Sequence, residues 1–315
     1  MYAIAMDDFG GRDQLKGREM PDPAAGPGEV VIRIRAAGVN PVDCKIRKGL
    51  LQTRLPHQFP IIPGWDAAGE ILETGEGACR FRPGDRVYAY CRKPVVQWGA
   101  YAERIALPES SVARMPEGVA FEAAAALPLA ALTAWQSLFD AANLQRGQTV
   151  LIHAGAGGVG HFAVQLAREQ GARVLSTAGP SNLDFVRSLG ADEVIDYRAG
   201  DFREAVRRAA PDGVDVAFDT VGAAVQQASA DVVRRGGVLV SILAFDDEAS
   251  ITARGIRPAY VFVRPDRVQL ECLTERVESG RLIPHLERIY PLGAAAEAHD
   301  RIESGHVRGK LVLSV

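Results

Sequence analysis

The segment 149–178, TVLIHAGAGGVGHFAVQLAREQGARVLSTA, constrains the fold of this chain more than any other. Residues 150–153 form a short apolar run, which is typical of a buried strand. Residues 155–160 satisfy the pattern G-x-G-x-x-G, and 161–170 predict a helix that ends at Gly171. Residues 173–177 predict a second strand. The segment therefore predicts a strand, a glycine turn, a helix and a strand in direct succession.

The glycines of this turn indicate a bound dinucleotide. A strand that turns directly into a helix needs backbone angles that side chains forbid, and a pyrophosphate must approach the backbone closely. The free N–H groups and the positive end of the helix then face the phosphates. The alternative is a tight turn with no ligand, but four glycines within 155–160 favour the nucleotide. The predicted phosphate contacts are Gly155, Ala156, Gly157, Gly158 and Val159.

The end of the second strand bears on the choice of nucleotide. NAD sites usually place an acidic residue about 20 residues past the first glycine, where it holds the ribose 2′-hydroxyl. Here 175–178 reads Leu-Ser-Thr-Ala and contains no acid that would repel a 2′-phosphate. NADP(H) is therefore favoured over NAD, although no Lys or Arg follows before Arg187. The predicted polar contacts to this nucleotide are Ser176, Thr177, Ser181 and Tyr197.

Composition argues against several classes of function. The chain has 315 residues, enough for two domains. Its 36 basic and 39 acidic residues give a net charge of −3, with no basic footprint for nucleic acid or a membrane surface. The longest apolar region, 119–135, is interrupted by Glu122 and Pro128 and makes a poor membrane span. We therefore expect no nucleic-acid partner and no membrane association.

Cysteine usage and the first residues predict a cytoplasmic protein. The four cysteines are scattered and form no C-x-x-C pair, which fits a reduced compartment better than a disulfide framework or a metal knuckle. Residues 1–6 carry no basic segment of the kind that begins a signal peptide.

The predicted elements divide the chain into two parts that differ in secondary structure. Up to residue 117, short strands alternate with Pro-Gly turns and suggest a barrel-like domain; the clearest strands are 29–35, 67–74, 86–90 and 100–107. From 120 onwards, helices at 121–126 and 129–142 lead into alternating strands and helices, which is typical of a doubly wound parallel sheet. Later predicted elements are a helix at 223–233, strands at 237–243 and 259–263, and a helix at 266–279.

We expect the last strand, within 309–315, to return to the first domain. The predicted fold class is therefore α/β, with a Rossmann-type doubly wound parallel sheet at 121–265 and a discontinuous β-barrel domain at 1–120 and 266–315.

Several short blocks match a known family at similar spacings from end to end: 37–43 (AGVNPVD), 63–69 (PGWDAAG), 84–87 (GDRV), 99–103 (GAYAE), 127–134, the glycine turn, 189–192 (LGAD) and 309–310 (GK). By these blocks the chain resembles the medium-chain dehydrogenase/reductase superfamily, in its zinc-independent branch around quinone oxidoreductases. The resemblance implies a GroES-like catalytic domain, a Rossmann domain, a cleft between them and commonly a homodimer.

The resemblance also addresses zinc. Zinc-dependent members place Cys, His and Cys where this chain has Asn40, Trp65 and Leu129. A catalytic zinc needs three protein ligands, so we expect none here. Without that Lewis acid, a quinone or an α,β-unsaturated carbonyl (an enone) is a better hydride acceptor than a simple ketone, because the resulting charge is delocalised. The expected reaction is hydride transfer from NADPH to such an acceptor.

Three candidate catalytic residues follow from family position. Asn40 is expected to place its amide on the nicotinamide ribose or the substrate oxygen, or else to satisfy its own turn. Asp43 either orients Asn40 or a relay water, or caps a helix that begins at Cys44. Thr133 is expected to contact the nicotinamide end, or else to pack within its helix.

Further apolar and ring-bearing candidates have core packing as their alternative. Leu243 and Phe262 are expected to flank the nicotinamide ring. Trp65 is expected to form an apolar wall of the site. His153 is expected to make a structural contact near the turn, and its alternative is contact with the cofactor.

Two other functions stay open at the level of sequence. Leu50 and Leu51 stand where quinone oxidoreductases often carry a Tyr, which makes the expected pocket more apolar and weakens a specific assignment to quinones. One alternative is an enoyl-thioester reductase, for which a basic patch would be expected. The other is an NADPH-binding structural or regulatory protein with little turnover.

Overall fold

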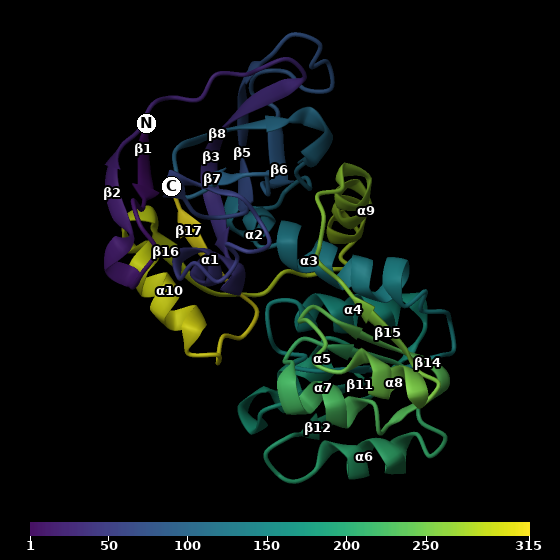
Figure 1. Cartoon of the computed structure of the whole chain (residues 1–315). Coiled ribbons are helices and arrows are strands. Elements are labelled where there is room, and N and C mark those ends of the chain that lie inside the picture. The colour runs from purple at the N-terminus through teal and green to yellow at the C-terminus, as the bar shows by residue number, and fades with distance from the viewer. The chain divides into compact units, whose positions relative to one another are not determined.

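The computed structural model describes residues 1–315 and contains two compact units. Unit 1 comprises 1–132, 264–280 and 284–315, and unit 2 comprises 133–263 and 281–283. Both termini therefore lie in unit 1 (Figure 1). No helix combines the length and the apolar character needed to cross a membrane.

Unit 1 is built on a sheet of mostly antiparallel strands in the order β16-β17-β3-β5-β6-β9, with β8 also paired to β3. The strands of this unit are β1 (Tyr2–Ala5), β2 (Lys16–Glu19), β3 (Glu29–Val39), β4 (His57–Ile62), β5 (Asp66–Thr74), β6 (Arg86–Tyr90), β7 (Val96–Trp98), β8 (Arg104–Pro108), β9 (Val112–Arg114), β16 (Leu286–Pro291) and β17 (Lys310–Ser314). Its helices are α1 (Pro41–Arg47), α2 (Phe121–Ala125), α9 (Arg267–Glu278) and α10 (Ala295–Glu303).

The central strand β3 is longer than the alternating pattern at 29–35 predicts. Alternation stops at Arg35 because 36–39 is small and buried on both faces, yet the backbone stays extended to Val39. There β3 pairs antiparallel with β17, with Leu311 opposite Val39 and Leu313 opposite Ala37. The C-terminal strand thus completes the sheet begun by the N-terminal residues.

One predicted strand of unit 1 begins later than expected. Residues 100–107 were expected to be extended throughout, but β8 starts only at Arg104. The preceding backbone instead bonds to the first strand: the Ile4 N–H donates to the Tyr101 carbonyl, and the Glu103 N–H donates to the Tyr2 carbonyl. A partner distant in sequence therefore redirects this segment.

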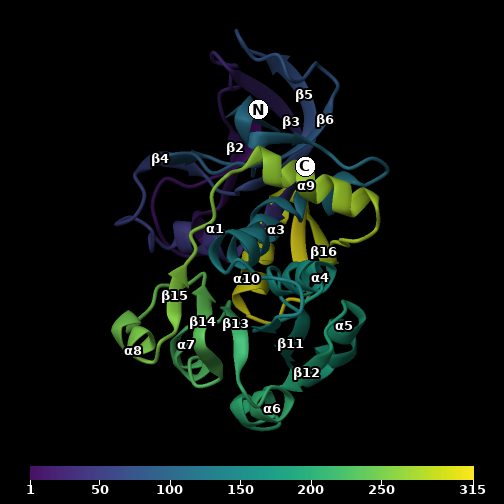
Figure 2. The same ribbon diagram turned by 90° about the vertical axis from the view of Figure 1, so that its right-hand side faces the viewer.

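Unit 2 contains a fully parallel sheet in the order β12-β11-β10-β13-β14-β15, which runs from β15 at one edge to β12 at the other (Figure 2). Its strands are β10 (Thr149–Ile152), β11 (Arg173–Ala178), β12 (Glu193–Asp196), β13 (Val214–Asp219), β14 (Val233–Ser241) and β15 (Arg257–Tyr260). Its helices are α4 (Gly160–Gln170), α5 (Leu183–Ser188), α6 (Phe202–Ala209), α7 (Ala223–Ser229) and α8 (Glu248–Ala253). The predicted α/β class with a doubly wound sheet is confirmed.

Several predicted boundaries in this part of the chain were wrong. The strand expected at 237–243 is β14, which begins at Val233 and ends at Ser241. The helix expected at 129–142 is α3 (Pro128–Trp135), which continues as a π-helix over Gln136–Ala141. The helix expected at 223–233 ends at Ser229, because Val233 already pairs with Val214 in the sheet. The strand expected at 259–263 is β15, which ends at Tyr260.

Candidate functional site

The glycine turn connects β10 to α4, and two of its glycines are required by packing. A Cβ on Gly155 would lie 2.1 Å from the Ser176 Oγ atom, and a Cβ on Gly160 would lie 2.1 Å from the Ala154 carbonyl oxygen. Any side chain at either position would therefore collide with the protein itself. These two glycines allow strand and helix to pack closely.

Gly157 is different, because packing does not explain it. A Cβ there would meet only the Ala154 carbonyl oxygen, at 3.3 Å, and its φ is not positive. The glycine leaves bare backbone beside the first turn of α4, at the carboxyl edge of β10. This edge lies at the switch point where strand order reverses between β10 and β13. The geometry fits the close approach of a dinucleotide pyrophosphate.

The side chains of Ser176 and Thr177, two of the predicted nucleotide contacts, are both hydrogen-bonded inside unit 2. Ser176 is fully buried, and its hydroxyl donates to the Ile152 carbonyl at 2.9 Å. The Thr177 hydroxyl is also buried; it accepts from the Ala154 N–H at 3.2 Å. Both residues support the glycine turn: as neighbours on β11 they point to opposite faces of the sheet, and both side chains are buried. The sequence showed their polarity but not the direction of their side chains.

Ser181 and Tyr197 remain on the surface beyond the carboxyl ends of β11 and β12. The Tyr197 side chain is about half exposed (49%), and its hydroxyl would lie 3.7 Å from a Cβ on Gly179. The guanidinium of Arg198 lies 5.7 Å from the centre of the Tyr197 ring. The loops after β11 and β12 therefore present hydroxyl groups and a cation at the edge where the nucleotide ribose is expected.

His153 is held inside unit 2 by hydroxyl groups. Its Nε2 atom lies 2.8 Å from the Ser229 Oγ, which itself donates to the Val225 carbonyl, so the ring proton is on Nε2. Its Nδ1 atom lies 3.1 Å from the Thr177 hydroxyl. Burial lowers the pKa of His153 to about 4. These contacts agree with a structural role.

Asp219, at the end of β13, is a buried residue that the sequence interpretation missed. Its carboxylate accepts from the Val221 and Gly222 N–H groups at 2.9 Å each, and from the Ser241 hydroxyl at 2.7 Å. It therefore shapes the loops after β13 and β14 on the switch-point edge. An acid at the carboxyl end of a parallel strand, directly before Thr-Val-Gly, was the signal that could have revealed it.

Leu243 and Phe262 follow the strands β14 and β15 and are both partly buried. The Leu243 side chain packs over Gly222, where an added Cβ would lie 2.5 Å from its Cδ1 atom. Thr133 lies on α3 and is 3% exposed. Their placement near a nicotinamide ring stays a prediction.

In unit 1, Asn40 belongs to a buried polar cluster. Its Nδ2 group donates to the Asp66 Oδ2 at 2.8 Å, and its Oδ1 accepts from the Lys310 ammonium. The Leu129 N–H donates to the other Asp66 oxygen at 2.7 Å. Asn40 directly follows β3, and the other three residues belong to β5, β17 and the start of α3, all within unit 1. The sequence predicted Asn40 but neither of its charged partners.

Asp43 caps a helix, as one interpretation expected, but that helix does not begin at Cys44. Helix α1 begins at Pro41, and Asp43 lies in its first turn, where its Oδ2 accepts from the Asn40 N–H at 2.8 Å. The Tyr101 hydroxyl donates to the same oxygen at 3.1 Å. Its other oxygen is buried and has no hydrogen-bond partner. Burial raises the pKa of Asp43 to about 7.

A series of hydrogen-bonded side chains connects Asp43 to Arg47 and Glu303. The Tyr101 hydroxyl lies 3.2 Å from His299 Nε2, and the Arg47 Nε–H donates to His299 Nδ1 at 3.3 Å. The proton of neutral His299 is therefore on Nε2. Arg47 also pairs with Glu303 at 2.8 Å. The Arg47 guanidinium occupies the Nδ1 atom of His299. This series of side chains therefore orients Asp43 but cannot relay a proton through the His299 ring.

Trp65 is buried at 4% exposure, and its ring meets the Tyr90 ring edge-to-face at a centroid distance of 6.0 Å. Trp65 directly precedes Asp66 and so lies next to the polar cluster of Asn40, Asp66 and Lys310. No group of three His, Cys, Asp or Glu side chains lies close enough together to hold a metal ion.

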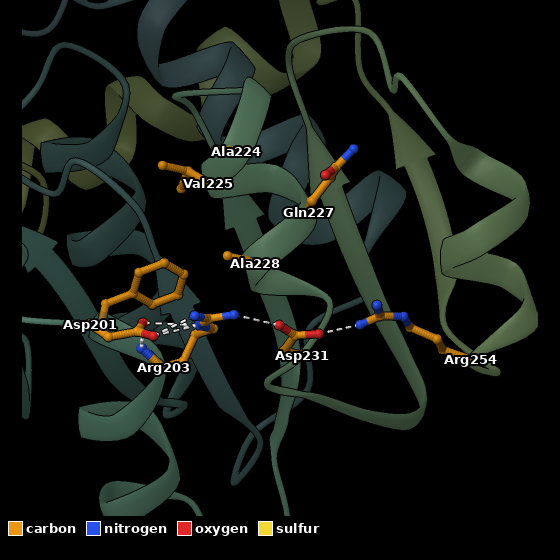
Figure 3. A pocket seen from close by; sticks show the side chains of 9 residues that line it. Asp201, Arg203, Ala224, Val225, Gln227, Ala228, Asp231 and Arg254 are labelled. Carbon is orange, nitrogen blue, oxygen red and sulfur yellow. Dashed lines mark hydrogen bonds and ion pairs between the residues drawn. The ribbon is translucent and has the colours of Figure 1, made fainter.

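A separate surface pocket of about 540 Å³ lies between α6, α7 and Arg254 in unit 2 (Figure 3). Its charged residues form a continuous series in which Arg203 pairs with Asp201 and Asp231, and Arg254 pairs with Asp231. Charge is balanced within this series. None of the predicted site residues lines the pocket.

Acid should destabilise the protein through two of its buried histidines, His153 and His299, which are neutral. Burial lowers the pKa of His153 and of His299 to about 4 each, below the value near 6.5 of an unfolded chain. Between these values the unfolded state binds the proton and the folded state does not, so stability is lost as pH falls from 6.5 towards 4. Each histidine contributes at most about 3 kcal/mol.

The measurement is urea unfolding of the native chain and a His153→Gln variant between pH 4 and 7. We expect the stability difference between the two to shrink as pH falls. A difference that is independent of pH would contradict a neutral, buried His153.

Comparison with known proteins agrees with this architecture. Residues 26–117 match the model of the alcohol dehydrogenase GroES-like domain, and 189–313 match that of zinc-binding dehydrogenases. A chloroplastic quinone-oxidoreductase homolog from Spinacia oleracea is 35% identical, over 99% of this chain and 98% of its own length. An NADPH-dependent alkenal/one oxidoreductase from Arabidopsis thaliana is 32% identical, over 99% of this chain and 79% of its own length.

Among solved structures, the quinone oxidoreductase of Escherichia coli complexed with NADPH superimposes with a TM-score of 0.91. It is 27% identical to this chain, and the match covers all of both chains.

Proposed function

The chain is an oxidoreductase of the medium-chain dehydrogenase/reductase family, in its quinone-oxidoreductase-like branch, and on this premise we propose that it transfers hydride from NADPH to a quinone or an α,β-unsaturated carbonyl. The observation that carries the proposal is the bare backbone at Gly157, at the switch point of a parallel sheet. The relatives whose names include NADPH, quinone or alkenal support the choice of cofactor and acceptor.

When bound, NADPH supplies the hydride. The N–H groups of the turn from Gly155 to Val159 hold its phosphates at the positive end of α4. Ser181 and Tyr197 are proposed to contact the 2′-phosphate, because they are exposed beyond a β11 end that carries no acid. Ser176 and Thr177 support the turn from inside.

The reacting end is proposed to be served by unit 1. Asn40 keeps one amide hydrogen beyond the one it gives to Asp66, and that hydrogen can meet a ligand oxygen. Asp43 holds the Asn40 backbone in place. Thr133, Leu243 and Phe262 are the proposed contacts of the nicotinamide ring.

We propose that this reaction proceeds without a metal. Asn40, Trp65 and Leu129 stand at the positions where zinc-dependent relatives hold their ligands, and none is a zinc ligand type. Charge on the product of a quinone or enone is delocalised, so hydrogen-bond donors suffice to stabilise it. A homodimer formed through the edge strand β15 is also proposed, from family membership and the unpaired edge of that strand.

The test is oxidation of NADPH, and in parallel of NADH, with 1,4-naphthoquinone, 9,10-phenanthrenequinone, 2-cyclohexenone, crotonyl-CoA and a simple ketone. We expect turnover of a quinone or the enone, with NADPH preferred, and no loss of activity after dialysis against a chelator. Turnover of the ketone alone would contradict the metal-free proposal. Preference for crotonyl-CoA would favour a thioester reductase, and binding without turnover a structural or regulatory role.

A further inference from the structure

Lys310 is a lysine buried where lysines are rarely found. Its side chain is 3% exposed, at the first residue of β17, where the next residue, Leu311, pairs with Val39 of β3. Its ammonium donates to the Val39 carbonyl at 3.0 Å and to the Asn40 Oδ1, and it lies 3.6 Å from the Asp66 Oδ2. Burying an ammonium costs free energy unless it is paired, so these contacts are what allow Lys310 to be buried.

All the polar groups that contact the Asp66 carboxylate are hydrogen-bond donors. The Leu129 N–H, the Asn40 Nδ2 group and the Lys310 ammonium all face its carboxylate. An ionised carboxylate only accepts hydrogen bonds, so this surrounding matches the charged form. Burial raises the pKa of Asp66, and the positive charge of Lys310 opposes that effect. Lys310 is the only cation that contacts Asp66, so its charge is the one that favours the ionised carboxylate.

The charged pair determines which way the Asn40 amide points. A terminal amide has two orientations of almost equal shape, and hydrogen bonds alone distinguish them. An ammonium that can only donate faces Oδ1, and a carboxylate that can only accept faces Nδ2. In the reverse orientation both contacts would be repulsive. One amide hydrogen and one oxygen lone pair of Asn40 are then left with a defined direction.

We propose that Lys310 is a positioning residue which, by keeping Asp66 ionised, holds the Asn40 amide in the single orientation that presents a hydrogen-bond donor to the reacting ligand. The part that concerns the ligand rests on the proposed function. The part that concerns the orientation of the amide does not.

Loss of the Lys310 charge has a defined effect on this cluster. Without that charge, burial would make Asp66 easier to protonate near neutral pH, and a protonated carboxyl can donate to the Asn40 oxygen as well as accept from its nitrogen. Both amide orientations would then be hydrogen-bonded and populated. The other groups near the cluster do not replace the charge: Asp43 is a second acid, and Tyr90, Tyr101 and His299 are neutral at this pH.

The experiment compares the native chain with Lys310→Met, which removes both charge and donor, and Lys310→Gln, which keeps an amide donor without the charge. The first readout is the 15N-resolved NMR signal of the Asn40 side-chain amide in the free protein, between pH 6 and 9. We expect one pH-independent pair of amide signals in the native chain. In both variants we expect signals that shift or double at low pH and return towards native positions as pH rises.

The second readout is steady-state kinetics with NADPH and the best acceptor. We expect kcat of Lys310→Met to fall by about 10- to 100-fold at pH 7, as for loss of a charge-assisted hydrogen bond, with partial recovery at pH 9. The KM for NADPH should stay within about threefold, because the phosphate site is in unit 2. Lys310→Gln should lie between native and Lys310→Met.

Removing one partner of a buried pair destabilises a fold, so circular dichroism and urea unfolding establish how much of each variant is folded. Loss of kcat without any pH-dependent recovery would overturn the proposal, as would native Asn40 amide signals in both variants. If no acceptor is turned over but the amide signals titrate as expected, the proposed function fails and the orienting role of Lys310 stands.

Discussion

Replacement of Gly157 by Asp is expected to abolish NADPH binding while leaving the fold intact. A Cβ at this position meets only the Ala154 carbonyl oxygen, at 3.3 Å, so a side chain fits if that backbone atom moves by a few tenths of an ångström. The same side chain would occupy the space in which a pyrophosphate approaches the backbone, and its negative charge would repel the phosphates at the positive end of α4. We expect NADPH affinity to fall at least about 100-fold, which corresponds to about 2.7 kcal/mol.

Fluorescence titration of NADPH measures the affinity, and circular dichroism with thermal unfolding measures the fold. The matched control is Gly160→Ala, whose Cβ would lie 2.1 Å from the Ala154 carbonyl oxygen and which should lower thermal stability. If Gly157→Asp bound NADPH as the native chain does, the turn would not be the phosphate site. If it unfolded like Gly160→Ala, the argument from open space at Gly157 would be wrong.

The Asp219→Ala variant is expected to lose about 3–5 kcal/mol of stability, the cost of removing one partner from a buried charged hydrogen-bond set. Alanine would leave the N–H groups of Val221 and Gly222 and the hydroxyl of Ser241 without their acceptor. These groups are close to the carboxyl edge of the parallel sheet. We therefore also expect weaker NADPH binding, because the loop after β13 would lose its shape.

Differential scanning calorimetry should show a lower melting temperature, by on the order of 10 °C. Asp219→Asn is the matched control, because its amide oxygen keeps the shape and an acceptor but not the charge. We expect the Asn variant to be affected less than the Ala variant. Equal and small effects for both would show that Asp219 is not a main support of these loops.

The sequence predicted best where structure depends on neighbours along the chain. The observed bounds of β10, α4 and β11 agree with the predicted ones to within one residue. Each combines a strong apolar pattern with a nearby Gly or Asp that marks its end. Predictions failed where a distant partner intervened. Tyr101 bonds to the first strand instead of extending β8, and Val233 joins the sheet instead of ending α7.

The candidate site divides in the same way. The glycine turn could be located from sequence because its pattern depends on the geometry of adjacent residues. The internal hydrogen bonds of Ser176 and Thr177 could not be predicted, because a strand's polar residues point to either face and only the packed sheet shows what each one meets. Asn40 was selected from family position, but the sequence gives no reason to pair it with a particular charge.

By itself, then, the sequence determined the parallel α/β unit, its glycine turn and the absence of an acid at the end of β11, since all three are encoded by short-range patterns. Only the tertiary structure decided that Asn40 lies between Asp66 and Lys310, which are 26 and 270 residues away along the chain. The physical reason is that β3, β5 and β17 are adjacent only in the completed sheet, where burial makes these charges depend on one another.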